Sequence, residues 1–330
     1  MSGLRHLLRW EAGLAVLAVA LFVFMASASS DFATSFTLQS LALNSTVIGF
    51  LALGVAPVII SGDIDISIAA MLGLCTIVMA DVWHAGVNIW LAALISVLLG
   101  CVLGLANGIF VVLLELPSLA ITLGSMGAYT GIAFLILGGS AITGFPNSLI
   151  TLGTGLAPGT GIPWSTFVLL AAAAVLAFLL HRTVVGRAIF AIGSNKQASR
   201  FSGLAVVRTK ILVFVISGLM SGVAAIFYAG YFDTAQGGLG AEDLLPAITV
   251  VILGGVSAYG GTGTIPGVVL ALFVLGILQT GLGVLGLSGQ EQTIAVGLTL
   301  ILALAVSAAS RAVRGRLATS SPRVSSREAA

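Results

Sequence analysis

The sequence contains 330 residues, of which 58% are hydrophobic and only 7% are charged, and its mean hydropathy is +1.18. Soluble domains usually carry about 25% charged residues, so this composition excludes a soluble domain and predicts an all-α polytopic membrane protein. The formal net charge is only +2, and we interpret the charges as signals of membrane topology rather than of affinity for nucleic acid.

The 13 lysine and arginine residues fall in three separate blocks. Arg5 and Arg9 lie at the start, six cations lie between Arg182 and Lys210, and five lie in the tail from Arg311. Loops rich in lysine and arginine stay on the cytoplasmic side of a membrane. We therefore expect the N-terminus, segment 182–210 and the C-terminus to face the cytoplasm.

The first apolar run, Gly13–Met25, has two interpretations. It follows two arginines and precedes the small residues Ala26, Ser27 and Ala28, a pattern typical of a signal peptide. It also serves as a first transmembrane helix, for which about 20 apolar residues are needed. Because the rest of the chain is membrane-embedded, we expect an uncleaved helix.

Further apolar runs bring the expected total to about ten transmembrane helices. Even numbers of spans on both sides of segment 182–210 return the chain to the same face, in agreement with the charges. Residues 1–310 therefore form one membrane domain, and 311–330 form a basic, disordered tail near the anionic inner leaflet. The further spans are Leu43–Gly62, Ile66–Trp83, Ile89–Leu114, Pro117–Gly138, Trp164–His181, Ile211–Gly230, Leu244–Tyr259, Ile265–Leu285 and Gln292–Ala309.

The connection between the second and third spans carries two acidic residues, Asp63 and Asp65. A charge inside the bilayer costs at least about 2.5 kcal/mol, so such residues usually face a cavity or the interior of the bundle. In an extended turn, Asp63, Asp65 and Ser67 share one side. They either line the translocation path near an inner gate, or lie in a cytoplasmic turn where Asp65 or Ser67 caps the next helix.

Small and hydroxylated residues recur at helical spacing in the later spans. Thr122 and Ser125 place two hydroxyls on one face of the fifth span, available to a polar solute or to a neighbouring helix. Glycines four residues apart allow helix backbones to approach closely. Such glycines are Gly100, Gly104 and Gly108 in the fourth span, and Gly218 and Gly222 in the seventh.

The outer connection Gly139–Pro163 is uncharged and rich in Gly, Pro, Ser and Thr, so we expect an ordered loop packed on the outer face. Segment 182–210 contains a predicted short helix, Asn195–Ser202. Ser194 and Gln197 fit a capping box at its start, and Gly203 fits its left-handed end. A helix this short needs a surface to pack on, so the segment is either a solvated loop or a docking helix for a soluble partner.

No pattern in the chain predicts catalysis, a cofactor or a metal site. Cys75 and Cys101 lie in apolar spans, and the three histidines lack metal-ligand spacing. The glycine-rich stretch Leu253–Gly267 lacks the Gly-Lys-Ser/Thr of a P-loop and follows no predicted strand, so it is not a nucleotide site. We also find no nucleophile–base pair and no paired catalytic carboxylates.

Taken together, five stretches resemble the membrane permease of bacterial ATP-binding-cassette (ABC) importers for simple sugars, of the ribose type. The overall pattern is closest to the branch that imports rhamnose or autoinducer-2. Ser61 and Asp63 depart from the family pattern, which leaves the identity of the solute open. The stretches occur in family order and are Ile60–Ser67, Leu116–Gly124, Gly186–Asn195, Ala198–Gly203 and Leu253–Gly267.

The resemblance implies a permease of the bacterial inner membrane that works in a pair, with a second copy or a paralogue. Two ATPase subunits lie below it and a periplasmic sugar-binding protein lies above it, so ATP is hydrolysed on a partner and the chain itself is not an enzyme. The pair then alternates between outward-open and inward-open states. The implied ATPase-coupling residues are Arg187, Gly193, Ser194, Ala198, Arg200, Phe201 and Gly203. The expected path residues are Asp63, Asp65, Ser67, Thr122 and Ser125.

Two other functions fit the residues. An ion- or proton-coupled secondary transporter would use Asp63, Asp65 or Glu115 as its coupling site. A scaffold subunit would have no solute path at all. The remaining acidic residues are predicted at span ends or in outer connections, which favours the importer.

Overall fold

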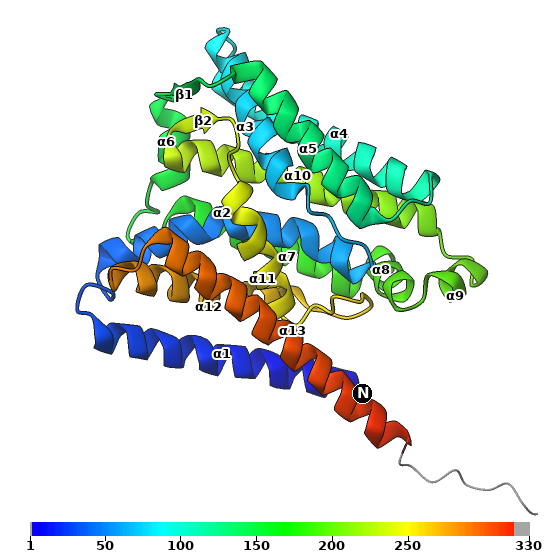
Figure 1. The fold of residues 1–330 in the computed structure, drawn as a ribbon. Coiled ribbons are helices and arrows are strands. Elements are labelled where there is room, and N and C mark those ends of the chain that lie inside the picture. The colour runs from blue at the N-terminus through cyan, green and yellow to red at the C-terminus, as the bar shows by residue number, and fades with distance from the viewer. Residues whose placement is uncertain (1, 320–330) are drawn as a thin grey trace, which may run out of the picture.

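The protein, seen in a computed structural model, is a bundle of long helices, which confirms the expected all-α class (Figure 1). The structure describes the backbone of residues 2–319 and the side chains of residues 10–306. The elements are α1 Ser2–Ala28, α2 Ser35–Ile60, α3 Ile68–His84, α4 Ile89–Leu113, α5 Ser118–Leu137, β1 Ala141–Thr143, α6 Asn147–Thr154, α7 Trp164–Arg182, α8 Val184–Ser194, α9 Lys196–Phe201, α10 Val206–Phe232, β2 Thr234–Gln236, the 3₁₀ turn η1 Ala241–Asp243, α11 Leu244–Leu253, α12 Ile265–Val284 and α13 Gly289–Thr319.

Eight of the described helices are long and apolar enough to cross a membrane. The predicted third and eighth spans are instead shorter helices: α3 has 17 residues and α11 has 10. Because about 20 residues span the hydrocarbon core, these helices connect opposite ends of the bundle only with the help of non-helical segments (Figure 1). Segment 61–67 precedes α3, and segment 254–264 follows α11.

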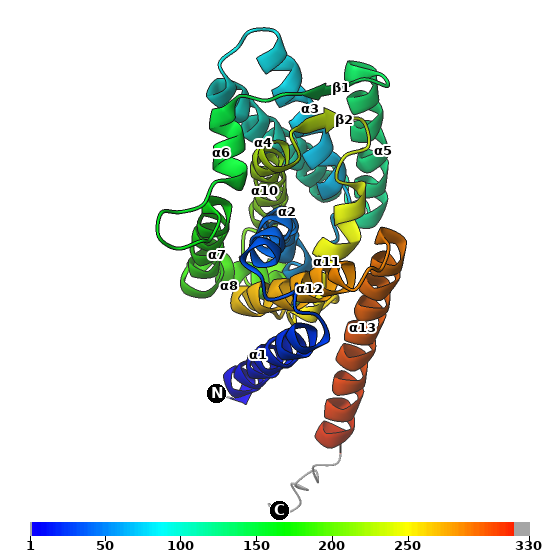
Figure 2. The same ribbon diagram turned by 90° about the vertical axis from the view of Figure 1, so that its left-hand side faces the viewer.

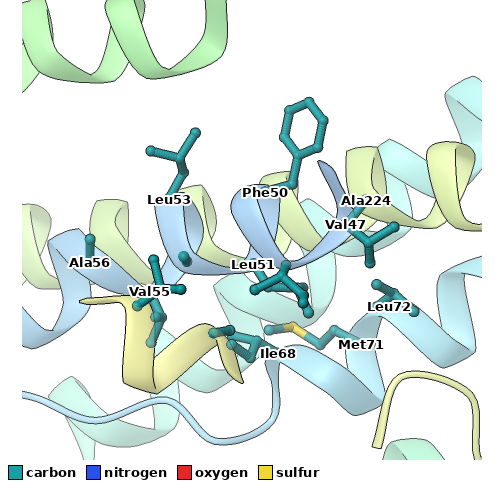
Figure 3. Close-up of a cluster of buried hydrophobic side chains, with 14 of the residues drawn as sticks. Val47, Phe50, Leu51, Leu53, Val55, Ala56, Ile68, Met71, Leu72 and Ala224 are labelled. Carbon is teal, nitrogen blue, oxygen red and sulfur yellow. The ribbon is translucent and has the colours of Figure 1, made fainter. Parts of the chain in front are cut away.

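Helix α2 is the centre of the core. Its first turn is capped by Thr34, whose hydroxyl accepts from the backbone N–H of Thr37, and its second half is buried throughout. The α2 side chains interlock with those of α3 and α10 (Figure 3). Phe50, for example, stacks on Phe227 of α10 with a ring separation of 5.2 Å. A helix that is apolar on every side fits such a central position.

The glycines at four-residue spacing bring α4 and α10 into backbone contact, as predicted. A Cβ atom on Gly100 would overlap the carbonyl oxygen of Gly218, and one on Gly104 would overlap the carbonyl oxygen of Phe214. In the same way, a Cβ atom on Gly222 would lie 2.8 Å from the Cα of Val97. These glycines therefore set the distance between the two helices.

The connection between α5 and α7 is an ordered structure, as expected. Strand β1 pairs antiparallel with β2, and α6 packs on α10 where Gly153 meets Gly230. The carboxylate of Asp233, which ends α10 in a left-handed conformation, accepts from Phe145 N–H at 2.8 Å. This layer covers one end of the bundle.

The opposite end carries the three cationic segments together. The start of α1, the short helices α8 and α9, and the C-terminal end of α13 all lie on the same side of the bundle (Figure 1). Figure 2 looks along the helices from the other end. Helix α13 continues to Thr319, so residues 311–319 are helical where we expected disorder; residues 320–330 lie outside the described part of the chain.

This arrangement predicts which thiols an impermeant reagent reaches. In a variant lacking Cys75 and Cys101, a cysteine replacing exposed Ser148 on α6 should react in intact cells, because the topology expected from the cationic segments puts this end of the bundle outside. A cysteine replacing exposed Ser202 beside α9 should react only after the membrane is opened. Labelling is measured with a membrane-impermeant maleimide. Reaction of the Ser202→Cys variant in intact cells would contradict the topology.

Candidate functional site

The feature that distinguishes this bundle is the break between α2 and α3. The C-terminal end of α2 is followed by Gly62, which has a φ of 84°, and by an extended segment up to Ser67. Asp65 and Ser67 have no exposed surface, and Asp63 is 8% exposed. The structure therefore places these three predicted site residues inside the bundle, beside the start of α3.

Asp65 organises the start of α3. One carboxylate oxygen accepts from the Ser67 N–H at 2.9 Å and from the Ser67 hydroxyl at 2.6 Å. The other oxygen accepts from the Ser217 hydroxyl of α10 at 2.8 Å. Ser67 occupies the N-cap position of α3, but its side chain makes no capping hydrogen bond, and the contact of Asp65 with the Ser67 N–H closes a turn before the helix. The prediction that Asp65 or Ser67 caps α3 in a cytoplasmic turn is therefore wrong, and the Asp65 carboxylate instead joins this turn to α10 inside the bundle.

Asn107 and Tyr129, which the sequence analysis did not identify as site residues, complete this network together with the predicted Ser125. The side-chain amide of Asn107 donates to Ser67 Oγ at 2.8 Å, and its Oδ1 accepts from Ser125 at 2.6 Å and from Tyr129 at 3.0 Å. Asn107 is fully buried in α4. A lone amide within the apolar fourth span was the available signal, because polar groups in a bilayer need partners.

The backbone at the break is satisfied by α5. Ser118 Oγ accepts from Ile64 N–H at 3.1 Å, and the Thr122 hydroxyl lies 3.3 Å from the Ile64 carbonyl oxygen. Unpaired backbone groups at membrane depth cost several kcal/mol each, so these contacts stabilise the extended segment. Of the two uses predicted for Thr122 and Ser125, contact with neighbouring elements is the one seen in this conformation.

Asp63 forms a buried ion pair with Lys210. The Lys210 Nζ lies 2.7 Å from Asp63 Oδ2, and the two side chains are only 7% and 9% exposed. No aligned hydrogen bond reaches that oxygen, so the contact is mainly an attraction between charges. A cation is unfavourable near the N-terminus of a helix, and Asp63 offsets this cost at the start of α10. The pair links segment 182–210 to the break.

Segment 182–210 folds as two helices, α8 and α9, rather than one. The predicted cap was one residue early: Ser194 is still part of α8, where its hydroxyl donates to the Phe190 carbonyl oxygen at 2.9 Å. Asn195 caps α9 instead, with its Oδ1 accepting from Ala198 N–H at 2.9 Å. Gly203 follows α9 with a φ of 78°, as predicted.

The end of α8 touches the break through glycines. A Cβ atom on Gly193 would overlap the Ile60 carbonyl oxygen and would lie 2.6 Å from Gly261 N. Gly261 N–H itself donates to the Ile60 carbonyl oxygen at 2.8 Å. Gly260 has a φ of 83°, and a Cβ atom on it would lie 2.8 Å from the Cα of Gly62. We call this contact of α8, the end of α2 and the loop 254–264 the glycine junction.

Helix α9 presents its side chains to solvent. Phe201 is 85% exposed, and Ala198 is also exposed. Arg200 Nη1 lies 4.0 Å from Glu115 Oε1. Both side chains are highly exposed, so this ion pair contributes little to stability. Arg187 on α8 is exposed as well. Among the described residues, no group of three His, Cys, Asp or Glu side chains could hold a metal ion.

Comparison with known proteins places these features in a family. The family model described as branched-chain amino acid transport system / permease component matches residues 37–306. The autoinducer 2 import system permease protein LsrD of Yersinia enterocolitica is 38% identical over 259 residues, which cover 77% of this chain and 78% of the relative. LsrD of Yersinia pseudotuberculosis is 36% identical over 301 residues, 89% of each chain. No solved structure matches.

The buried ion pair predicts an asymmetric mutational response. Lys210→Met leaves Asp63 as an uncompensated buried charge and should destabilise the protein by about 3–5 kcal/mol. The double variant Asp63→Asn, Lys210→Met removes both charges and should recover most of that loss. Thermal unfolding in detergent measures both effects. Arg200→Met, which breaks only the exposed pair with Glu115, should change stability by less than about 1 kcal/mol. A double variant no more stable than Lys210→Met would contradict this account.

Proposed function

The chain belongs to the family of permease components matched over residues 37–306, and we propose that its solute is a small sugar-like molecule of the rhamnose, ribose or autoinducer-2 type. It is the multi-pass membrane subunit of an ABC importer in the bacterial inner membrane. Its relatives are permeases that import autoinducer 2, and this supports the sugar-like class over the amino acids of the family description. Permeases of this kind are not themselves enzymes.

ATP hydrolysis, in this proposal, takes place on a separate ATPase subunit that docks on α9. The observation that carries this proposal is the exposed apolar surface at the cationic end of the bundle: Phe201 is 85% exposed and lies three residues from exposed Ala198. Aromatic anchors surrounded by polar residues commonly dominate protein interfaces. The cationic rim around them supports a cytoplasmic position.

The contacts inward from α9 provide a route for coupling. Asn195 joins α9 directly to α8, and α8 contacts the end of α2 at the glycine junction. Lys210 at the start of α10 forms the second link, through its ion pair with Asp63. An ATPase that moves α9 therefore acts on the break between α2 and α3. Asp63 and Asp65 border the inner gate in this proposal, and a periplasmic binding protein delivers solute to the opposite face.

The remaining partner is a second permease, either another copy or a paralogue. Helix α5 supports this part of the proposal, because Gly124, Gly127 and Gly131 have no protein atom within 4 Å of an added Cβ. Leu123 and Leu135 on the same helix are 54% and 85% exposed. The secondary-transporter alternative has less support, because Asp63 is paired with Lys210 and Asp65 is bonded to serines.

Docking on α9 is tested by Ala198→Asp. If this face enters an ATPase groove, the new carboxylate is buried without a partner. Such burial costs several kcal/mol, which corresponds to binding weaker by more than about 100-fold. The variant should therefore insert at normal levels but lose co-purification with the ATPase and lose uptake.

Ala85→Asp is the matched control, because Ala85 is exposed at the opposite end of the bundle. It should retain ATPase binding, because the proposed ATPase surface lies at the other end of the bundle. An Ala198→Asp variant that binds the ATPase and transports like the wild type would show that α9 is not the docking element.

A further inference from the structure

A cavity of about 490 Å³, lined by both apolar and polar side chains, opens near the end of the bundle opposite α9. It lies between the first turns of α2, the end of α12, the start of α13 and the turn η1 that leads into α11. Small-molecule sites typically measure about 300–1,000 Å³. The cavity is therefore large enough for a small solute, and it lies on the side from which an importer receives its cargo.

The polar part of the lining combines two carboxylates, three amides and several hydroxyls. Glu242 and Asp243 come from η1, Gln279 and Thr280 from α12, and Ser40 and Ser45 from α2. Among the residues whose side chains the structure describes, no lysine, arginine or histidine lines the cavity. Polar side chains at membrane depth usually face a bundle interior or a water-filled path, and here they converge on one space from three separate elements.

Thr37, Gln292 and Thr293 of the lining are hydrogen-bonded within the protein, whereas a second group of lining residues has no such partner. The Ser45 hydroxyl is buried and has no hydrogen-bond partner among the described residues, and the Ser45 residue is only 5% exposed. The side chains of Ser40, Gln279, Thr280, Glu242 and Asp243 likewise form no hydrogen bond or ion pair with any described residue. A buried hydroxyl without a partner is costly, so its retention calls for a ligand or a functional explanation.

We propose that this cavity binds the transported solute, and that the solute is an uncharged polyhydroxyl compound. Carboxylate and amide oxygens accept from solute hydroxyls, while Ser40, Ser45 and Thr280 can donate or accept. The inference rests on the proposed function and locates the binding site of its solute.

The position of η1 connects this cavity to the break. A Cβ atom on Gly240 would lie 2.8 Å from the Ala69 carbonyl oxygen, and one on Gly73 would lie 2.7 Å from the Leu239 carbonyl oxygen. The turn is thus packed against the first residues of α3. A second cavity of about 320 Å³ is lined by Gly238, Leu239, Ala241 and Leu244 of the same turn. A solute bound at Asp243 therefore contacts η1, the turn that packs on the start of α3 close to Asp65.

The test uses cells that express the permease with its ATPase and binding protein. Initial uptake is measured with labelled autoinducer-2, D-ribose, L-rhamnose and L-leucine as probes. The wild type should accumulate at least one sugar-like probe and not leucine. Ser45→Ala and Asp243→Asn should each lower that uptake at least 10-fold, with normal abundance and normal ATPase co-purification.

Two controls separate solute binding from folding. Ser45→Ala removes an unpartnered hydroxyl, so a purely structural role predicts unchanged or higher thermal stability and unchanged uptake. Ser221→Ala removes a buried hydroxyl that donates to the Ser217 carbonyl oxygen within α10, and it should leave uptake within twofold of the wild type.

Each of the other possible results would contradict a specific claim about the cavity, the solute class or the proposed function. Wild-type uptake in both Ser45→Ala and Asp243→Asn, beside an active parent, would show that the cavity is not the solute site while leaving the proposed function intact. Loss of ATPase co-purification in the same variants would likewise remove the inference. Uptake of leucine in place of the sugars would contradict the polyhydroxyl class. An ATPase-bound wild type that accumulates none of the probes would contradict the proposed function as well.

Discussion

The fold depends on one constraint: backbone polar groups inside a bilayer must find partners within the protein. A continuous helix meets this requirement by itself, but segment 61–67 does not. The structure meets it with Ser118 and Thr122 at Ile64, and with Asp65 at the start of α3. Because these partners come from α5 and from the segment itself, the break is a stable element whose geometry depends on its neighbours. A non-helical segment of this kind is tolerated where protein surrounds it.

Two links connect this element to the cationic end of the bundle, and they differ physically. The glycine junction is a contact of backbones, in which Gly193 leaves no space for a side chain against Ile60. The second link is the charge pair between Lys210 and Asp63. Packed backbones transmit a displacement because they cannot be compressed, whereas a buried ion pair resists separation. Together they make α8, α10 and the end of α2 a mechanically connected unit.

Much of this organisation could be predicted from the sequence. Hydropathy located the long helices because about 20 apolar residues are a physical requirement for crossing. The glycine spacing in α4 and α10 predicted their close contact, and the cation blocks predicted three segments on one side. These predictions succeeded because each depends on local composition or on a short repeat.

Other features depend on the three-dimensional course of the chain, and composition alone does not predict that course. Hydropathy alone could not show that α11 ends at Leu253. The glycine-rich residues that follow it carry no charge, so their hydropathy does not mark the end of the helix. The cap of α9 was placed at Ser194 instead of Asn195, since both residues favour that position. The Asn107 network and the pairing of Lys210 with Asp63 join residues distant in sequence. Their partners become visible only once α4 and α10 lie beside the break.

The central claim is that the glycine junction transmits ATPase movement to the break, and Gly193→Ala tests it most directly. Alanine favours a helix more than glycine does, so α8 itself should not be weakened. The added methyl group would instead separate α8 from Ile60. In a complex of permease, ATPase and binding protein, the account predicts that the Gly193→Ala variant still binds the ATPase and hydrolyses ATP but loses at least about 90% of its uptake. A variant with normal uptake per ATP hydrolysed would contradict it.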